Sequence, residues 1–417
     1  MEFLYVIWQI FKLWGWVLLP IALYFPAKSF YLFWLRWSVW REKQKWIVLE
    51  VIPPEKIEKP YAAMEDIFSI FWGIYGSPDW REKWCEGVLP LAPYWISLEI
   101  ASINGKIHFF IRVNEDNRNV VESSIYSHYP DAEISLVNDY TKDVPQDMPN
   151  KDWDIHGEDY KLMNDNAYPI KTYKYFEIKA EEIKGEKKLD PIVSLLEMMS
   201  NLKKGEQFWL QIIAAPITND DIPWVTKGRE IADKIALRKK KKKKSVISEI
   251  FDMIFWPSIE SSKNGDEKAS IEENLTPGEK EVLSAVETKI SKSGFKTSIR
   301  TIYLAKKDVY NGDNSKLARP YFKHFCSENL NGISDWGETK TSAHYFLTKR
   351  RLYVKKRDIF TKYIERLPPK SPNMVEGTSV LNAEELATIY RFPINMLVSA
   401  TPKTQSRKAE APPDLPV

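Results

Sequence analysis

The chain has 417 residues, and its 60 Lys and Arg nearly balance its 57 Asp and Glu, so net charge alone does not indicate a class of partner. The two cysteines, Cys85 and Cys326, lie far apart without metal-ligand spacing, which argues against a disulfide framework and suits a reducing compartment. The length is sufficient for two or three domains.

The longest apolar run lies at the start of the chain, Phe3–Phe25, and only Gln9 and Lys12 interrupt it. As a helix rising about 1.5 Å per residue it would reach roughly 34 Å, against about 30 Å of membrane hydrocarbon. Basic residues follow the run rather than precede it: Lys28, Arg36, Arg41, Lys43 and Lys45. The sequence therefore predicts a single transmembrane helix with the body in the cytoplasm. The alternative is a buried or interfacial hydrophobic helix.

Lys12 shares a helical stripe with Trp8 and Trp16. A lysine near mid-span costs about 2.5–3.5 kcal/mol, so this stripe predicts contact with a partner helix. The alternative is a shifted span from which Lys12 reaches the membrane surface. The aromatic segment Ser29–Trp40 predicts an interfacial helix or a hairpin partner, so residues 1–45 are interpreted as an anchor region.

Residues 46–140 show the pattern of a first folded domain. A β-branched strand is expected at Trp46–Ile52 and a helix around Met64–Ile74. The dipeptide Asn104-Gly105 favours a tight hairpin, and this turn pairs Ile100 with Phe109, Leu98 with Ile111 and Ile96 with Val113, all on one face. The opposite, exposed face would then carry Ser97, Glu99, His108, Phe110 and Arg112.

A helix at about Glu115–Ser127 and a strand at Glu133–Val137 complete the order β-α-β-β-α-β. This order is that of a ferredoxin-like unit, in which two helices cover one face of an antiparallel sheet.

Residues 165–310 predict a second unit with similar element order. Its expected elements are an extended segment Thr172–Lys179, a helix that Asp190 caps, a strand Gln207–Ala215, a helix with the capping box Thr276/Glu279, and a strand Phe295–Ala305. The predicted fold class is therefore α+β: an N-terminal transmembrane helix followed by two ferredoxin-like units.

The second unit carries a helical, basic insertion at residues 225–275. Six consecutive lysines, Lys239, Lys240, Lys241, Lys242, Lys243 and Lys244, precede the apolar segment Ser245–Trp256. Such a cluster suits anionic lipid or nucleic-acid phosphates, or is a solvated tip. Together with Arg350 and Arg351 these lysines are the candidate membrane or phosphate contacts. Residues 311–400 are expected to be mostly helical, and residues 401–417 to be disordered.

Motifs of catalysis are missing. The sequence contains no GxxxxGK[ST], GxGxxG, HExxH, GxSxG or CxxC motif, and its five histidines are scattered. We therefore predict a protein that is not an enzyme and that binds no cofactor or metal.

Several segments together resemble the membrane-proximal region of type IV secretion and conjugation-like DNA-translocating ATPases of small-genome bacteria. The segments are WISLEIASINGKIHFFIRVNEDNRNVVESSIYSHYPDAEI, LLEMMSNLKKGEQFWLQIIAAPI, IRTIYLAKKDVY and LNAEELATIYRFP. The resemblance spans roughly residues 40–395 and includes no active-site motif. In the longer relatives this region precedes a motor domain of the FtsK/HerA type, whereas this chain stops at Val417, where the motor would begin.

The resemblance implies a structural accessory component of a secretion or DNA-transfer machine, anchored in the bacterial cytoplasmic membrane. Its expected partners are membrane lipid, a separate translocase ATPase and further copies of itself. The alternative is a membrane-tethered module that binds nucleic acid, although the hairpin lacks the aromatic pattern of RNA-recognition sheets.

Overall fold

The computed structural model describes residues 2–34, 44–55, 57, 60–76, 80, 95–175, 190–236, 275–343, 345, 347–371 and 376–393. The first part of the body contains β1 (Trp46–Ile52), α3 (Pro60–Trp72), β2 (Ile96–Ile103), β3 (Lys106–Asn114), η2 (Glu115–Asn117), α5 (Arg118–His128), β4 (Glu133–Val137) and η3 (Tyr140–Asp143). The second part contains β5 (Trp153–Leu162), α7 (Pro191–Ser200), β6 (Glu206–Ile217), α8 (Trp224–Ile235), α11 (Pro277–Ile290), β7 (Gly294–Lys306), η4 (Gly312–Lys316), α12 (Ala318–Lys323), β8 (Ile333–Asp335), α13 (Thr348–Glu365), β9 (Ser379–Asn382) and α14 (Ala383–Ile389).

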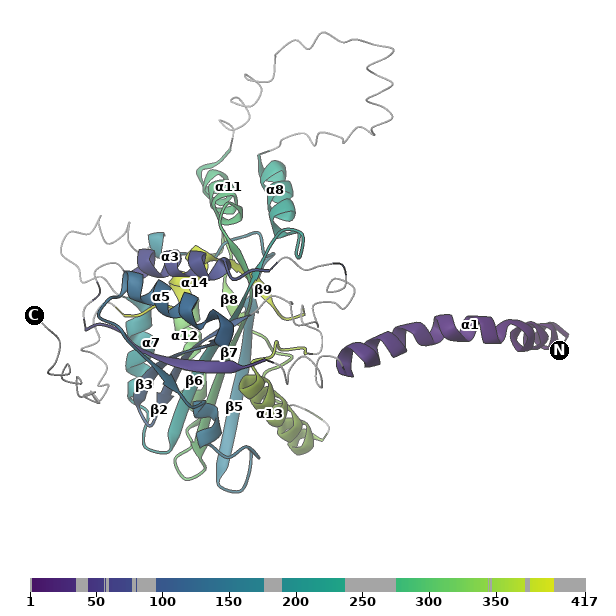
Figure 1. Cartoon of the computed structure of the whole chain (residues 1–417), viewed down its shortest axis with the longest axis horizontal. Helices are drawn as coiled ribbons and strands as arrows, with labels where there is room; N and C mark the ends of the chain where they lie inside the picture. Colours follow the sequence, from purple (N-terminus) through teal and green to yellow (C-terminus); the bar gives the residue numbers. More distant parts are fainter. Residues whose placement is uncertain are drawn as a thin grey trace, which may run out of the picture.

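The strands of both parts form one antiparallel sheet of nine strands (Figure 1). The order is β4-β1-β3-β2-β6-β7-β5-β8, and β9 pairs with β7. From its outer edge to the centre of the sheet, the first half has the order β4, β1, β3, β2, and the second half has the matching order β8, β5, β7, β6. The two halves meet where β2 pairs with β6, from Ile96↔Ala214 to Ile103↔Gln207. The predicted fold class, two separate ferredoxin-like units behind a transmembrane helix, is therefore wrong: the fold is mixed α/β around a single large sheet. The physical reason is that β2 and β6 are buried along nearly their whole length, so neither can serve as an open edge.

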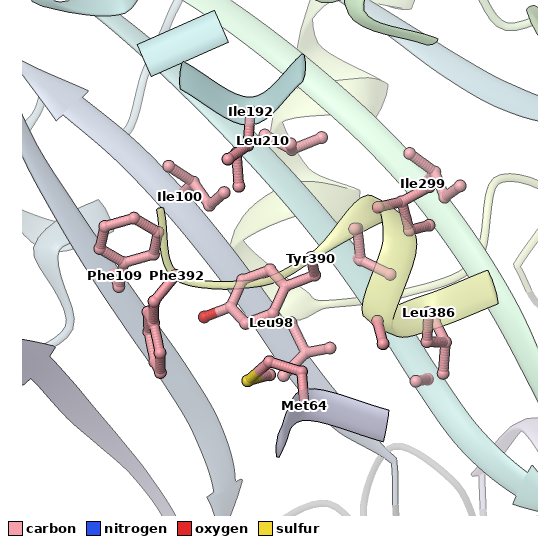
Figure 2. Close-up of a cluster of buried hydrophobic side chains, with 14 of the residues drawn as sticks. Met64, Leu98, Ile100, Phe109, Ile192, Leu210, Ile299, Leu386, Tyr390 and Phe392 are labelled. Carbon is pink, nitrogen blue, oxygen red and sulfur yellow. The ribbon is translucent and has the colours of Figure 1, made fainter. Parts of the chain in front are cut away.

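The two faces of the sheet are covered differently. Helices α3, α5, α7, α12 and α14 pack their apolar side chains on one face and form the main core. Figure 2 shows part of this core, which includes Leu98 and Leu210 of the central strands and Leu386 and Tyr390 from the last described segment of the chain. The other face carries a smaller core around Trp209 and is covered by α13 and by the segment around η3.

Local signals in the sequence are confirmed where they are strong. Asn104 and Gly105 have φ values of 54° and 82°, and the hairpin pairs Ile100 with Phe109 as expected. The capping box of Thr276 with Glu279 is present, and Asp190 caps α7 through the backbone amide of Ile192.

Other local expectations are wrong. Tyr173–Tyr175 form a helical turn instead of a strand, and residues 176–179 lie outside the described part of the chain. At the start of the segment 311–400, which was expected to be mostly helical, the helix α12 is only Ala318–Lys323. The strand β5 was not predicted, and its residues WDIHGEDYKL lose their alternation of polarity at Gly157, Glu158 and Asp159.

The long N-terminal helix α1 (Glu2–Trp34) extends away from the body (Figure 1). Among the described residues no helix is both long and apolar enough to cross a membrane. The predicted transmembrane anchor, the single-pass localisation in a bacterial membrane and the orientation derived from it are therefore wrong. The predicted interfacial helix at Ser29–Trp40 continues α1 as far as Trp34, and residues 35–43 are outside the described part.

Candidate functional site

The structure separates the residues that the sequence analysis grouped together. Trp8, Lys12 and Trp16 lie on α1, where the Trp8 side chain is 63% exposed. Arg350 and Arg351 lie in the exposed first turns of α13. Lys239 to Lys244 are outside the described residues.

The outer face of α13 is basic and also carries apolar side chains. We name it the α13 basic surface: Lys349, Arg350, Arg351, Tyr353, Val354 and Arg357, all of which are exposed. Residues 339–357 include seven Lys or Arg and no Asp or Glu. The guanidinium of Arg357 lies 5.9 Å from the ring centroid of Tyr353, and its Nη1 donates to the Tyr353 hydroxyl at 3.2 Å. The surface therefore concentrates positive charge next to an aromatic ring.

Lys355 shows how closely the cations are spaced. Burial lowers the pKa of Lys355, and the positive charge of Arg351 lowers it further. The Lys355 ammonium group donates to the carbonyl oxygens of Lys340 and Ser342, both at 3.2 Å. These two bonds hold it against the segment that precedes α13. An anion bound to this face would relieve the repulsion between these charges.

The inner face of α13 packs on the sheet. Ile359, Phe360 and Tyr363 are buried, and the ring of Tyr363 lies 5.2 Å from that of Trp209. Gly157 of β5 permits this approach, because a Cβ atom there would lie 2.7 Å from Cδ1 of Ile359. Lys356, at the edge of this face, donates to Asp154 of β5 at 2.5 Å. The basic surface is therefore mounted on a rigid element.

A buried ion cluster fixes the C-terminal end of α13. Arg366, which has a φ of 53° and is fully buried, donates through Nε and Nη2 to the Glu99 carboxylate at 2.9 and 3.1 Å. It also donates through Nη1 and Nη2 to Asp139 at 2.5 and 3.0 Å. Burial by itself would raise the pKa of Glu99, but the charge and hydrogen bonds of Arg366 hold this pKa below its usual range. The same balance lowers the pKa of Asp139, and the two carboxylates raise the pKa of Arg366.

The cluster continues across the sheet as a row of polar side chains in register. Glu99 pairs with Gln211, Gln211 with Arg300, and Arg300 with Asp159, on four neighbouring strands. Gln211 Nε2 donates to Glu99 at 3.0 Å and to the carbonyl of Tyr363 at 3.1 Å. Arg300 donates to Asp159 at 2.7 Å and to the carbonyl of Leu367 at 3.0 Å. This row therefore bonds the end of α13 to the centre of the sheet.

The sequence analysis missed this row because it placed Glu99 on the exposed face of the hairpin. In the structure Glu99 is fully buried and Phe110 is 4% exposed, since α13 and the segment around η3 cover that face. Helix α13, which covers Glu99, follows it by about 250 residues in the chain, so no pattern among the neighbours of Glu99 indicates that this residue is buried. The available signal was Arg300, a charged residue at the centre of the strand β7.

Other buried charges are paired in the same way. On the opposite side of β5, Glu158 accepts hydrogen bonds from His156 and Arg319. Burial would raise the pKa of Glu158, but these partners lower it to about 2. Within the part of the chain that the structure describes, no group of three or more His, Cys, Asp or Glu side chains could hold a metal ion.

Comparison with known proteins supplies a family. No curated protein matches the chain. The family described as a domain of unknown function, DUF8128, matches residues 91–324, a span that runs from β2 to α12 and ends before α13. This span is more than half of the 417 residues, and the chain therefore belongs to the DUF8128 family.

Proposed function

We propose that this protein is a structural docking component without catalytic activity, and that α1 is the helix by which it binds a protein partner. The observation that carries the proposal is the exposure of large apolar side chains along a helix that extends away from the body (Figure 1). The exposed side chains include Trp8 at 63%, Trp14 at 58%, Phe25 at 72% and Phe30 at 73%.

Exposed large apolar side chains gathered on one helix are typical of protein–protein contacts. Tryptophan is among the residues that contribute most to binding energy when a partner buries it. A helix that presents its side chains in this way suits a hydrophobic groove or a second helix as its receptor. The paired state of the buried charges also supports a structural function, since Glu99 pairs with Arg366 and Glu158 pairs with Arg319.

The resemblance of the sequence to the region before the motor of DNA-translocating ATPases supports one kind of partner. We propose that α1 docks on a separate ATPase of a secretion or DNA-transfer machine, or on a further copy of the chain within it. Contact through Trp8 and Trp16 on the Lys12 stripe remains part of this proposal.

The test is affinity purification of the full-length chain from its native cells, followed by mass spectrometry and light scattering. The test variant is Trp8→Ser/Phe25→Ser/Phe30→Ser, and the control is Tyr126→Ser, which alters an exposed aromatic residue on α5. We expect the wild type and the control to retain an ATPase that has its own phosphate loop, or to be oligomeric, and the α1 variant to lose both properties.

Retention of the same partners and the same mass by the α1 variant would contradict docking through α1. Hydrolysis of ATP by the purified protein alone would contradict the absence of catalysis.

A further inference from the structure

The α13 basic surface has the composition of a nucleic-acid contact. We propose that it binds single-stranded nucleic acid, with its arginines on the phosphates and Tyr353 and Tyr345 stacked on bases. This binding is separate from the docking of α1 and does not depend on it.

The first argument is the arrangement of side chains along the helix. Arg350, Tyr353, Val354 and Arg357 follow one another at intervals of three, one and three residues, so they form one stripe along the helix. All four are exposed. From Arg350 to Arg357 the helix rises about 10 Å, so its two ends can contact different phosphates of one strand.

The second argument is charge. The stretch Thr339–Arg357 contains no carboxylate, and α13 begins within it, so the helix dipole adds a partial positive charge at the same end. Burial and then the positive charge of Arg351 lower the pKa of Lys355, against the opposing effect of the Glu338 carboxylate. Phosphates placed between these cations would be attracted by all of them, and binding would release counterions from the nucleic acid.

The third argument distinguishes a single strand from a duplex and from an acidic protein. Tyr345 is 94% exposed, immediately before α13, and Tyr353 is 44% exposed within the stripe. Tyrosine rings stack on unpaired bases, whose faces are accessible only in single strands, and Arg357 beside Tyr353 adds a cation to the platform. An acidic protein would be bound by the charges alone and would not need the rings.

The mounting of α13 supports the proposal. Arg366 and Lys356 fasten the helix to the sheet through Glu99 and Asp154, so the stripe is presented in a fixed orientation. A preformed surface loses less conformational entropy on binding than a flexible basic tail.

The test is fluorescence anisotropy with labelled 20-nucleotide oligothymidylate and the full-length protein. The charge variant is Arg350→Glu/Arg351→Glu. Its matched control is Lys203→Glu/Lys204→Glu, which changes the net charge by the same amount at an exposed turn between α7 and β6. Circular dichroism and thermal melting establish that each variant folds as the wild type does.

We expect the charge variant to lose at least tenfold in affinity at low salt and the control to lose less than threefold. The slope of log K against log salt should become shallower by about 1.4 in the charge variant, because about 0.7 is expected for each phosphate contact on a single strand.

The stacking variant is Tyr353→Ala. We expect it to lose roughly tenfold in affinity for oligothymidylate and almost none for an abasic oligonucleotide of the same length, since stacking on one base is lost. Equal losses for the two oligonucleotides would overturn the stacking. Wild-type affinity in the charge variant, or no binding by the wild type at low salt, would overturn the whole proposal. Tighter binding of polyglutamate than of oligothymidylate would assign the surface to an acidic protein instead.

Discussion

Removal of the Arg366 charge should destabilise the protein strongly without touching its surface. In the variant Arg366→Met, Glu99 and Asp139 lose four charge-assisted hydrogen bonds, with donor–acceptor distances of 2.9, 3.1, 2.5 and 3.0 Å. Glu99 is fully buried, so water cannot replace the guanidinium unless the structure opens.

The expected loss in the free energy of unfolding is about 3–5 kcal/mol, the range found when one partner of a buried ion pair is removed. The unfolding entropy of a chain of 417 residues, at about 2 cal/mol/K per residue, is roughly 0.9 kcal/mol/K. The midpoint temperature of thermal unfolding should therefore fall by about 5 °C. The neutral variant Arg366→Met/Glu99→Gln/Asp139→Asn should recover at least half of this loss, because it leaves no unpaired charge in the core.

The measurement is urea unfolding at pH 7, followed by tryptophan fluorescence. Trp209 reports on this site directly, because its ring lies 5.2 Å from that of Tyr363 on α13. The control is Arg357→Met, an exposed arginine of the same helix, for which a change below about 0.5 kcal/mol is expected. A loss of less than about 1 kcal/mol in the free energy of unfolding for Arg366→Met would refute the inference that Arg366 stabilises the fold by compensating the buried charges of Glu99 and Asp139.

Further expectations concern turns, packing and acid. Gly105→Ala should destabilise the fold by roughly 1–3 kcal/mol in thermal melting, because φ is 82° and the new Cβ would lie 2.7 Å from the carbonyl oxygen of Leu202; an unchanged melt would contradict this. Gly157→Ala should cost about 1–3 kcal/mol by pressing on Ile359, and adding Ile359→Val should restore part of it, whereas identical melts for the two variants would exclude the clash. Glu158 has a pKa of about 2 when folded and about 4.3 when unfolded, so its contribution is complete above pH 4.3 and is lost as pH falls towards 2. Urea titrations across this range should be less steep in pH for Glu158→Gln than for the wild type, and equal slopes would disprove the assignment.

The sequence predicted those features that neighbouring residues determine. Asn104-Gly105 fixed the register of its hairpin because positive φ at both positions leaves few alternatives. The caps at Asp190 and Thr276 were equally local, since each side chain bonds to an amide two or three residues away. Candidate residues Arg350 and Arg351 were recognised by charge, but only the structure shows that they lie on an exposed helical stripe with Tyr353.

The features that the sequence could not predict depend on distant residues. The pairing of β2 with β6 joins the two halves, and nothing within either strand specifies the other as its partner. The burial of Glu99 requires α13, which follows about 250 residues later. The anchor prediction rested on the apolar run Phe3–Phe25, and it is contradicted because no helix among the described residues is long and apolar enough to cross a membrane.

The bond between Glu99 and Arg366 also sets a condition on the order of folding. The two residues are 267 positions apart, so a ribosome working at about 5–20 residues per second needs roughly 10–50 s to synthesise the stretch between them. During that time β2 and β3 can form their hairpin, but the Glu99 carboxylate has no cation to accompany it into the interior. The first half must therefore keep this face hydrated until the last quarter of the chain arrives, and the closing of α13 over the sheet becomes a late step of folding.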